Sequence, residues 1–260
     1  MADTPILELR KVNKSFGPVQ VLHDIDLSVY PGQVTALVGD NGAGKSTLIK
    51  CIAGIHHVDS GEFFFGGNQV TLGSPRDAAA LGIEIVYQDL ALADNLDIVQ
   101  NMFLGRESKN RLRQLDEGAM EAQARTVLSS LSVRTVKSVR QPVSSLSGGQ
   151  RQTVAIAKAV LWNSKVVILD EPTAALGVAQ TRQVLDLVRR LADRGLGVVL
   201  ISHNMNDVIE VSDRIDALYL GRIAAEVKAA DASVSQVVEL ITTGRSGDLG
   251  LSRATADANL

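Results

Sequence analysis

A glycine-rich segment near the start of the chain limits the folds that the chain can adopt. It follows an apolar run at residues 34–38 that is typical of a buried strand, and it precedes a helix-like run to about residue 53, with Gly54 placed to end it. The segment matches the pattern G-x-x-x-x-G-K-S/T over Gly39, Asp40, Asn41, Gly42, Ala43, Gly44, Lys45 and Ser46. A glycine-rich turn between a strand and a helix directs backbone N–H groups and the helix dipole toward a phosphate. The segment therefore predicts an α/β fold that contains a phosphate-binding loop.

Two side chains of this loop are suited to a nucleotide triphosphate. We expect Lys45 to contact the β- and γ-phosphates and the Ser46 hydroxyl to ligate Mg²⁺. Together with Thr47, the residues of the pattern form the predicted nucleotide-binding loop. A chance glycine-rich turn is the alternative, but the strand before the loop and the helix after it supply the context that the pattern requires.

An apolar strand that ends in two carboxylates complements the loop. Residues 166–169 are a run of valine, isoleucine and leucine, and Asp170 and Glu171 follow. Asp170 can hold Mg²⁺ through water, and Glu171 can polarise the attacking water as a general base. Taken alone, the two acids are as well explained as a solvated strand end. Beside a phosphate-binding loop, a catalytic role is favoured.

A second anion-binding segment lies about a hundred residues beyond the first. Its residues are Leu146, Ser147, Gly148, Gly149 and Gln150. A helical run over 151–162 follows, for which Ser147 is a suitable N-cap, and the two glycines let a phosphate approach backbone donors. A capped helix start explains Ser147 alone. It does not explain why a chain with one phosphate-binding loop has a second anion-binding helix end.

The remaining pattern predicts a β-rich start, a helical middle and a short tail. Alternating apolar residues within 6–30 predict antiparallel strands, and compact apolar runs at 83–87 and 198–201 predict further strands. The segment between 88 and about 162 is helical in pattern. Further predictions are a hairpin of 215–220 with 223–227, joined by Gly221 and Arg222, and a disordered tail at 244–260.

Composition excludes several classes of protein. With a formal net charge of −3 and 3% aromatic residues, the sequence lacks the basic and stacking surface of a nucleic-acid-binding protein. Its single cysteine, Cys51, allows no disulfide within the chain, indicates a reducing compartment and is expected to be a packing residue rather than a reactive thiol. Residues 1–5 have no signal-peptide character, and no apolar run approaches the ~20 residues of a membrane helix, so we expect a cytoplasmic protein.

The order and spacing of these motifs resemble the nucleotide-binding subunits of ABC transporters over residues 5–243. The resemblance implies one ABC ATPase domain that binds ATP and Mg²⁺. Its P-loop NTPase core, of RecA type and with an N-terminal antiparallel β-subdomain, would span about 5–87 and 163–243, and a helical subdomain at about 88–162 would be inserted into it. In that family, two subunits sandwich two ATP molecules, and the 146–150 motif of one completes the site of the other. The expected partner is therefore a second copy of the chain.

The resemblance assigns roles to three further residues. Gln88, after the strand at 83–87, would sense Mg²⁺ and water and link the core to the helical subdomain. His203, just past the strand at 198–201, would contact the γ-phosphate and orient Glu171, at the strand end where α/β proteins bind ligands. Phe16 would stack on adenine, with core packing as its alternative. The implied catalytic residues are Glu171, His203, Lys45 and Gln88, and the implied metal ligands are Ser46, Gln88 and Asp170.

One departure from the family pattern narrows the subfamily. Gly177 stands where most ABC cassettes have an aspartate that helps to couple the two sites. Residues 172–178, 101–107 and 201–205 resemble bacterial importers of simple sugars of the ribose, xylose and fructose type, in a single-cassette form. The resemblance implies a subunit on the cytoplasmic side of the membrane that works with a permease and, indirectly, with a periplasmic sugar-binding protein. Soluble ABC ATPases of translation or DNA repair, and exporter ATPases, are the alternatives.

Overall fold

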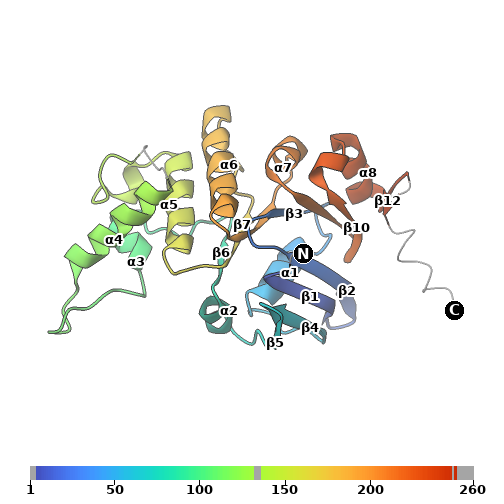
Figure 1. Cartoon of the computed structure of the whole chain (residues 1–260), viewed down its shortest axis with the longest axis horizontal. Coiled ribbons are helices and arrows are strands. Elements are labelled where there is room, and N and C mark those ends of the chain that lie inside the picture. The colour runs from blue at the N-terminus through green and yellow to red at the C-terminus, as the bar shows by residue number, and fades with distance from the viewer. Residues whose placement is uncertain (1–3, 132–135, 248, 251–260) are drawn as a thin grey trace.

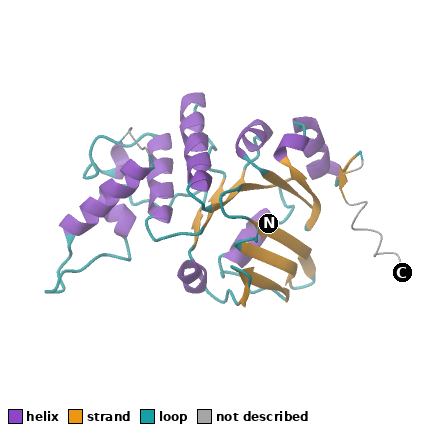
Figure 2. Cartoon of the chain, viewed as in Figure 1, coloured by secondary structure: helices purple, strands orange, loops and turns teal. Residues whose placement is uncertain are grey.

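A parallel six-stranded sheet forms the centre of the computed structural model, which describes residues 4–131, 136–247 and 249–250 (Figures 1 and 2). The order of its strands is β10-β9-β3-β8-β7-β6, and only β10 runs antiparallel to its neighbour. The strands are β3 (Val34–Gly39), β6 (Ile83–Val86), β7 (Val166–Asp170), β8 (Gly197–Ile201), β9 (Arg214–Tyr219) and β10 (Arg222–Lys228). The predicted α/β class is confirmed, and so are the strands expected near 34–38, 83–87, 166–169 and 198–201.

Both faces of this sheet are covered, which explains why its strands are continuous apolar runs rather than alternating ones. In β7, Val166 and Ile168 pack in the core shared with the N-terminal strands within residues 7–29, whereas Val167 and Leu169 pack in the core shared with the helices at 148–160 and 178–193. Figure 1 shows the helices α6 (Val178–Asp193), α7 (Met205–Val211) and α8 (Val234–Thr243) together on one side of the sheet.

The other face is covered by helix α1 (Lys45–Ile52) and a four-stranded antiparallel sheet of order β2-β1-β4-β5. Its strands are β1 (Leu7–Phe16), β2 (Val19–Val29), β4 (Ser60–Phe65) and β5 (Asn68–Val70). The antiparallel strands expected within 6–30 are therefore confirmed. Sequence reasoning missed β4 and β5, and also helix α2 (Pro75–Leu81), which Ser74 caps through its hydroxyl oxygen.

Between β6 and β7 the chain forms a helical region, which lies at the left of Figures 1 and 2. It contains α3 (Ile98–Phe103), α4 (Glu117–Ser130), a 3₁₀ turn at Val143–Ser145 and α5 (Gly148–Val160). Its helices bury Met102, Phe103 and Leu131 in the core that they share with α6. This region is the sequence insert that carries the 146–150 motif.

The C-terminal elements differ in part from expectation. The predicted hairpin of β9 and β10 is confirmed, with its turn at Leu220 and Gly221, both of which have positive φ angles. Residues 245–250, expected to belong to a disordered tail, instead include the short strands β11 (Arg245–Ser246) and β12 (Leu249–Gly250). Ser246 is buried there and donates a 2.7 Å hydrogen bond to Glu239 of α8. The rest of the predicted tail, residue 248 and residues 251–260, lies outside the described residues.

Candidate nucleotide-binding site

The glycine-rich loop lies at the C-terminal end of β3 and leads into α1, as the sequence predicts. Gly42 and Gly44 have φ angles of 83° and 109°, a backbone conformation that side-chain-bearing residues rarely adopt. At Gly44 a Cβ atom would also lie 2.9 Å from the Leu22 side chain. Glycine is therefore required at this position both by conformation and by the close approach of strand β2.

Lys45 holds the loop in a closed turn. Its Nζ atom donates hydrogen bonds to the backbone carbonyls of Gly39, at 2.6 Å, and Asp40, at 3.0 Å. The residue is only 9% exposed. Burial lowers the pKa of Lys45, and the negative charges of Glu171, Asp40 and Asp170 oppose that shift. A phosphate group arriving at the loop would therefore meet a cation that is already oriented and partly desolvated.

A cavity of about 430 Å³ opens above this loop. Its described lining consists of loop residues, the acid pair and three residues from other elements: Val21, Asn41, Gly42, Gly44, Lys45, Ser46, Thr47, Gln88, Asp170, Glu171 and His203. The fold thus brings Gln88, the acid pair and His203 to the loop, although they come from three separate strand ends. Sequence reasoning missed Val21, whose strand carried no signal of a ligand site.

Glu171 and His203 are paired within this cavity. The Nε2 atom of His203 lies 3.0 Å from the Oε1 atom of Glu171, and the backbone N–H of Glu171 donates to the carbonyl of Ile201 at 3.0 Å. Glu171 has a φ angle of 52°, which is uncommon for a residue with a long side chain. The neighbouring strand β8 therefore fixes the backbone of Glu171 in a sparsely populated conformation that aims its carboxylate into the cavity.

Both acids are harder to ionise than usual. Burial raises the pKa of Asp170, against the opposing charges of Lys45 and His203. Burial likewise raises the pKa of Glu171, against His203 and Lys45, while the nearby Asp170 raises it further. A carboxylate with a raised pKa is a stronger proton acceptor than a free one. Position and basicity together make Glu171 suited to accept a proton from water.

The predicted metal ligands Ser46, Gln88 and Asp170 all line this cavity. They offer oxygen atoms, which Mg²⁺ prefers, and leave room for the water and phosphate ligands that it usually retains. In the described part of the chain, no group of three histidine, cysteine, aspartate or glutamate residues could hold a metal on its own. The residues present fit a magnesium ion that is bound together with a nucleotide.

Two sets of predicted site residues lie elsewhere. Among the described residues that line the cavity, neither Phe16 nor residues 147–150 are found. Phe16 is 44% exposed and makes an edge contact with the His56 ring, with centroids 5.1 Å apart. It is thus an accessible aromatic face rather than a core residue. Of the loop residues, Gly39, Asp40 and Ala43 shape the turn without lining the cavity in the described structure.

The 146–150 motif begins helix α5. Ser147 and Gln150 form a reciprocal cap, in which the Ser147 hydroxyl accepts from the Gln150 backbone and the Gln150 side chain accepts from the Ser147 backbone. A Cβ atom on Gly149 would lie 3.0 Å from the Cβ of Gln180 on α6. Gly149 is therefore also a packing glycine, which allows α5 and α6 to approach closely.

Gly177, the departure noted in the sequence, is the N-cap residue of α6. Its φ angle is −73°, and a Cβ atom there would meet no described atom within 4 Å. Larger residues would therefore fit at this position.

Curated relatives match the sequence over nearly the whole chain. The family model described as ABC transporter matches residues 22–174. The fructose import ATP-binding protein FrcA of Rhizobium meliloti is 48% identical over 93% of this chain and 95% of its own. The xylose/arabinose import ATP-binding protein XylG of Sulfolobus acidocaldarius is 45% identical over 95% of this chain and 97% of its own.

Solved structures agree with the fold. The ADP conformation of an ATP-binding cassette of an ABC transporter has a TM-score of 0.78 and 26% identity, and covers 92% of this chain and 96% of that one. A dimeric bacterial ABC transporter cassette, at 23% identity, has a TM-score of 0.71 over 86% of this chain and 98% of its own, and shows the fold alone. In the described residues no helix is long and apolar enough to cross a bilayer. By the family match, the identities above and the arrangement of loop, acid pair and histidine, the chain belongs to the ABC transporter family.

Proposed function

We propose that the protein is the ATP-binding and ATP-hydrolysing subunit of an ABC importer and powers uptake of a monosaccharide through a separate membrane permease. The observation that carries the proposal is the single cavity in which Lys45, Asp170, Glu171 and His203 meet. The relatives are named as import ATP-binding proteins, and from these names we infer that this chain also serves import. Fructose and xylose/arabinose both occur among them, so the substrate class is a simple sugar.

Positioning and charge neutralisation carry the chemistry. Lys45 neutralises the β- and γ-phosphates, and Ser46, Gln88 and Asp170 would hold a Mg²⁺ ion, which supplies further positive charge to the transferred phosphoryl group. Glu171 accepts the proton of the attacking water as its general base. His203 lies close enough to hold the Glu171 carboxylate. We propose that it also contacts the γ-phosphate when ATP is bound. The loop residues Gly39–Thr47 cradle the phosphates.

The functional unit that we propose is a homodimer with two shared sites. Residues 147–150 lie at an N-terminal helix end suited to a phosphate, yet they do not line the described cavity. A second copy in head-to-tail orientation would add its own Ser147, Gly148, Gly149 and Gln150 to the nucleotide. Phe16, exposed at the edge of the β-subdomain, would cover the adenine ring.

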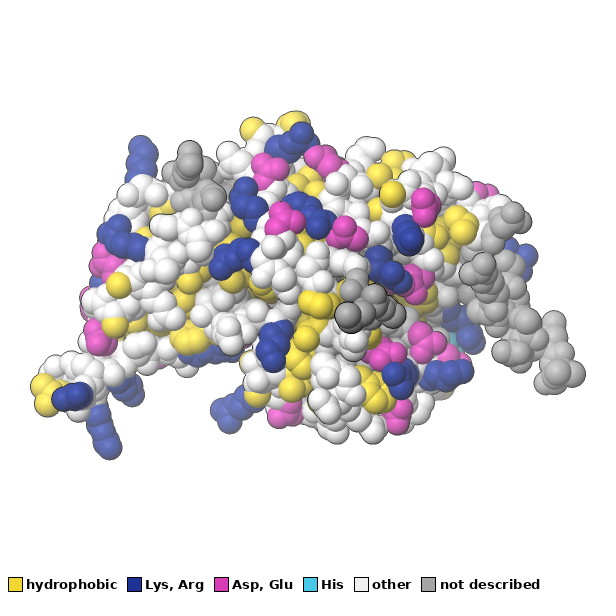
Figure 3. All heavy atoms as spheres, viewed as in Figure 1, with side chains coloured by type: hydrophobic (Ala, Val, Ile, Leu, Met, Phe, Trp, Pro, Cys, Tyr) yellow, Lys and Arg dark blue, Asp and Glu magenta, His cyan; other side chains and the backbone are white. Residues whose placement is uncertain are grey.

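Within each copy, we propose that residues 88–162 act as a helical subdomain that contacts the permease, and that the core spans 5–87 and 163–243. ATP binding would close the dimer and move this subdomain, and hydrolysis would reopen it. The subunit would lie against the cytoplasmic side of the membrane as a peripheral protein. A periplasmic sugar-binding protein would act through the permease. On the face seen in Figure 3, basic and acidic side chains are interspersed, which supports the expectation of no nucleic-acid partner.

The test is to tag the chain in its native host, solubilise the membranes gently and identify the proteins that co-purify. We expect a multi-span permease, with ATPase activity that one sugar-loaded binding protein raises. Each candidate sugar is tested with the same purified complex. Recovery from the soluble fraction with ribosomes or DNA would overturn the importer proposal in favour of a soluble ABC ATPase. Stimulation by a substrate moving outward would favour an exporter.

A further inference from the structure

The segment that follows Gln88 is joined along its backbone to the segment that precedes Ser147. The backbone N–H of Val143 donates to Leu96 at 3.0 Å, that of Ser144 to Asp94 at 3.1 Å, and that of Val99 to Val139 at 3.3 Å. A β-bridge also joins Asp97 to Pro142. We name the paired segments, residues 94–99 and 139–144, the strap.

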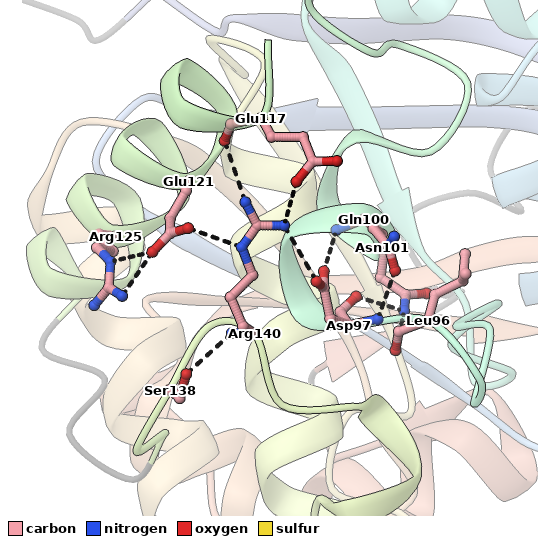
Figure 4. A network of polar contacts seen from close by, with 9 residues as sticks. All are labelled: Leu96, Asp97, Gln100, Asn101, Glu117, Glu121, Arg125, Ser138 and Arg140. Carbon is pink, nitrogen blue, oxygen red and sulfur yellow. Dashed lines mark hydrogen bonds and ion pairs between the residues drawn. The ribbon is translucent and has the colours of Figure 1, made fainter. Parts of the chain in front are cut away.

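Arg140 fastens the strap to the two neighbouring helices (Figure 4). Its Nε atom donates to Glu121 Oε2 at 2.8 Å, and its Nη1 atom lies 3.2 Å from Glu117 Oε2, both on α4. The same Nη1 atom donates to Asp97 Oδ2 at 3.4 Å. The other Asp97 oxygen, Oδ1, accepts from the backbone of Gln100 and caps α3. One guanidinium group thus ties the start of α3 and the start of α4 to the chain that leads to the 146–150 motif.

Two further side chains lock the strap from its other end. Arg151, on α5, forms an ion pair with Asp94, with 2.9 Å between its Nη1 atom and the Asp94 Oδ1 atom. Asn101 is fully buried, and its amide accepts from the backbone N–H of Ala93 and donates to the carbonyls of Ala93, Leu96 and Asp97. A buried amide that bonds only the backbone of one loop holds that loop in one conformation.

The strap connects two places that the proposed function uses in different ATP sites. Gln88, six residues before the strap, lines the cavity of its own subunit. Ser147, three residues after the strap, would serve the cavity of the partner. Hydrogen-bonded segments of a packed core shift as one body rather than deforming continuously. A displacement of the segment that contains Gln88 would therefore be carried to residues 147–150.

We propose that the strap, with Arg140 as its positioning residue, sets the position of the 147–150 motif relative to Gln88 and so couples the two ATP sites of the dimer. The proposal rests on the proposed homodimer. It gives the chain a route of communication that needs no aspartate at position 177. Arg140 itself is not among the described residues that line the cavity, and its described hydrogen bonds and ion pairs go to Asp97, Glu117, Glu121 and Ser138.

The test compares three variants with a matched control. Arg140→Met removes the guanidinium group and keeps a similar apolar stem. Asp97→Asn keeps an oxygen for the cap of α3, since asparagine and aspartate are equally good N-caps, but loses the acceptor for Arg140. Arg140→Lys keeps the charge without the forked geometry. Arg125→Met is the control, because Arg125 also pairs with Glu121, at 2.7 Å, and none of its described hydrogen bonds or ion pairs reaches the strap.

Each variant is made in the Glu171→Gln background, and two quantities are measured: ATP affinity at dilutions where the protein is monomeric, and the ATP-dependent dimerisation constant by analytical ultracentrifugation. We expect unchanged monomer affinity and a dimerisation constant that is ~10-fold weaker for Arg140→Met, a coupling of ordinary size. Asp97→Asn should show a smaller loss, Arg140→Lys an intermediate one and Arg125→Met none. Hydrogen exchange at Val143 and Ser144 should accelerate in Arg140→Met alone of the two methionine variants.

The outcomes separate this proposal from the homodimer on which it rests. Hydrogen exchange reports on the strap without a dimer, so unchanged exchange and an unchanged dimerisation constant in Arg140→Met overturn the strap proposal. Equal effects in Arg125→Met also overturn it, since they would make Arg140 one of several general helix contacts. If the parent Glu171→Gln protein binds ATP but does not dimerise, the homodimer is refuted, and the strap proposal falls with it.

Discussion

Replacing Glu171 with glutamine tests the catalytic assignment most directly, because the change keeps the size of the side chain and removes its ability to accept a proton. The carboxylate lies 3.0 Å from His203 and lines the same cavity as Lys45. Glutamine can still occupy this space and can keep a polar contact with the histidine. Nucleotide binding by Lys45 and the loop should therefore persist.

The magnitude follows from the role. General-base catalysis contributes ~10²- to 10⁴-fold to a rate, which corresponds to roughly 2.7–5.4 kcal/mol of the activation barrier. The free energy of unfolding of Glu171→Gln should stay the same or rise. Burial disfavours the charged form of Glu171, as its raised pKa shows, so a neutral side chain removes that penalty. We expect a turnover lower by at least ~100-fold and a melting temperature that is unchanged or higher.

Phosphate release measured at saturating ATP gives the turnover, and scanning calorimetry gives the melting temperature. Size-exclusion chromatography with ATP should show a trapped dimer. The matched control is Glu84→Gln, which alters an acid that pairs with Arg106 on the surface, at 2.9 Å, and should keep normal turnover. A Glu171→Gln protein whose turnover lies within tenfold of the parent would refute the general-base role.

Three further predictions follow from single positions. Lys45→Ala should weaken ATP binding by at least ~100-fold, because it removes a charge-assisted contact and frees two loop carbonyls; titration with a fluorescent ATP analogue measures this. Gly54→Ala should lower the free energy of unfolding by ~2 kcal/mol or more, because Gly54 has a φ angle of 69° and an added Cβ would lie 2.4 Å from the Ser74 carbonyl oxygen. Gly177→Asp, where the added side chain meets open space, should change the free energy of unfolding by less than ~1 kcal/mol. Urea unfolding compares the two variants, and equal effects would contradict the steric argument. Asp216 is buried, and burial raises its pKa to about 7, so the folded state keeps a proton that the unfolded chain releases near its ordinary pKa of 3.8. The stability that this group contributes to the folded state therefore falls as pH rises from about 4 to 7. The unfolding free energy of Asp216→Asn minus that of the parent should increase by a few kcal/mol over this range. Urea unfolding at pH 5 and pH 8 would detect the increase, and a difference that does not change with pH would contradict the prediction.

Local patterns predicted the elements whose residues carry their own signal. Strand β7 is a continuous apolar run because helices and sheet cover both of its faces, and the glycine-rich loop is recognisable because Gly42 and Gly44 need their φ angles. Strand β4 was missed because it pairs with β1, more than forty residues away, and β5 was missed with it because β5 only extends the sheet by pairing with β4. Period and composition within a short window cannot report such a partner.

The candidate-site residues that could be predicted from the sequence are those at the carboxyl ends of the parallel strands. Asp170 ends β7, Glu171 follows it and His203 follows β8, and the parallel register of the two strands brings their carboxyl ends to one edge. The second role of Gly149 could not be predicted, because its contact with Gln180 depends on how α5 and α6 pack. The same holds for Arg140, whose partners on α3 and α4 are distant in sequence. The ordered residues of 245–250 depend on a contact with α8 that composition does not reveal.

The burial of Cys51 has a practical consequence for following the motions proposed above. Its thiol is inaccessible, and burial raises the pKa of Cys51 to about 11, so at neutral pH it stays protonated and reacts slowly with maleimides. A cysteine introduced on the surface would then be the one fast-reacting thiol of each subunit. Fluorophores could be attached singly to the intact protein, and the opening and closing of individual dimers could be watched without first removing a native residue.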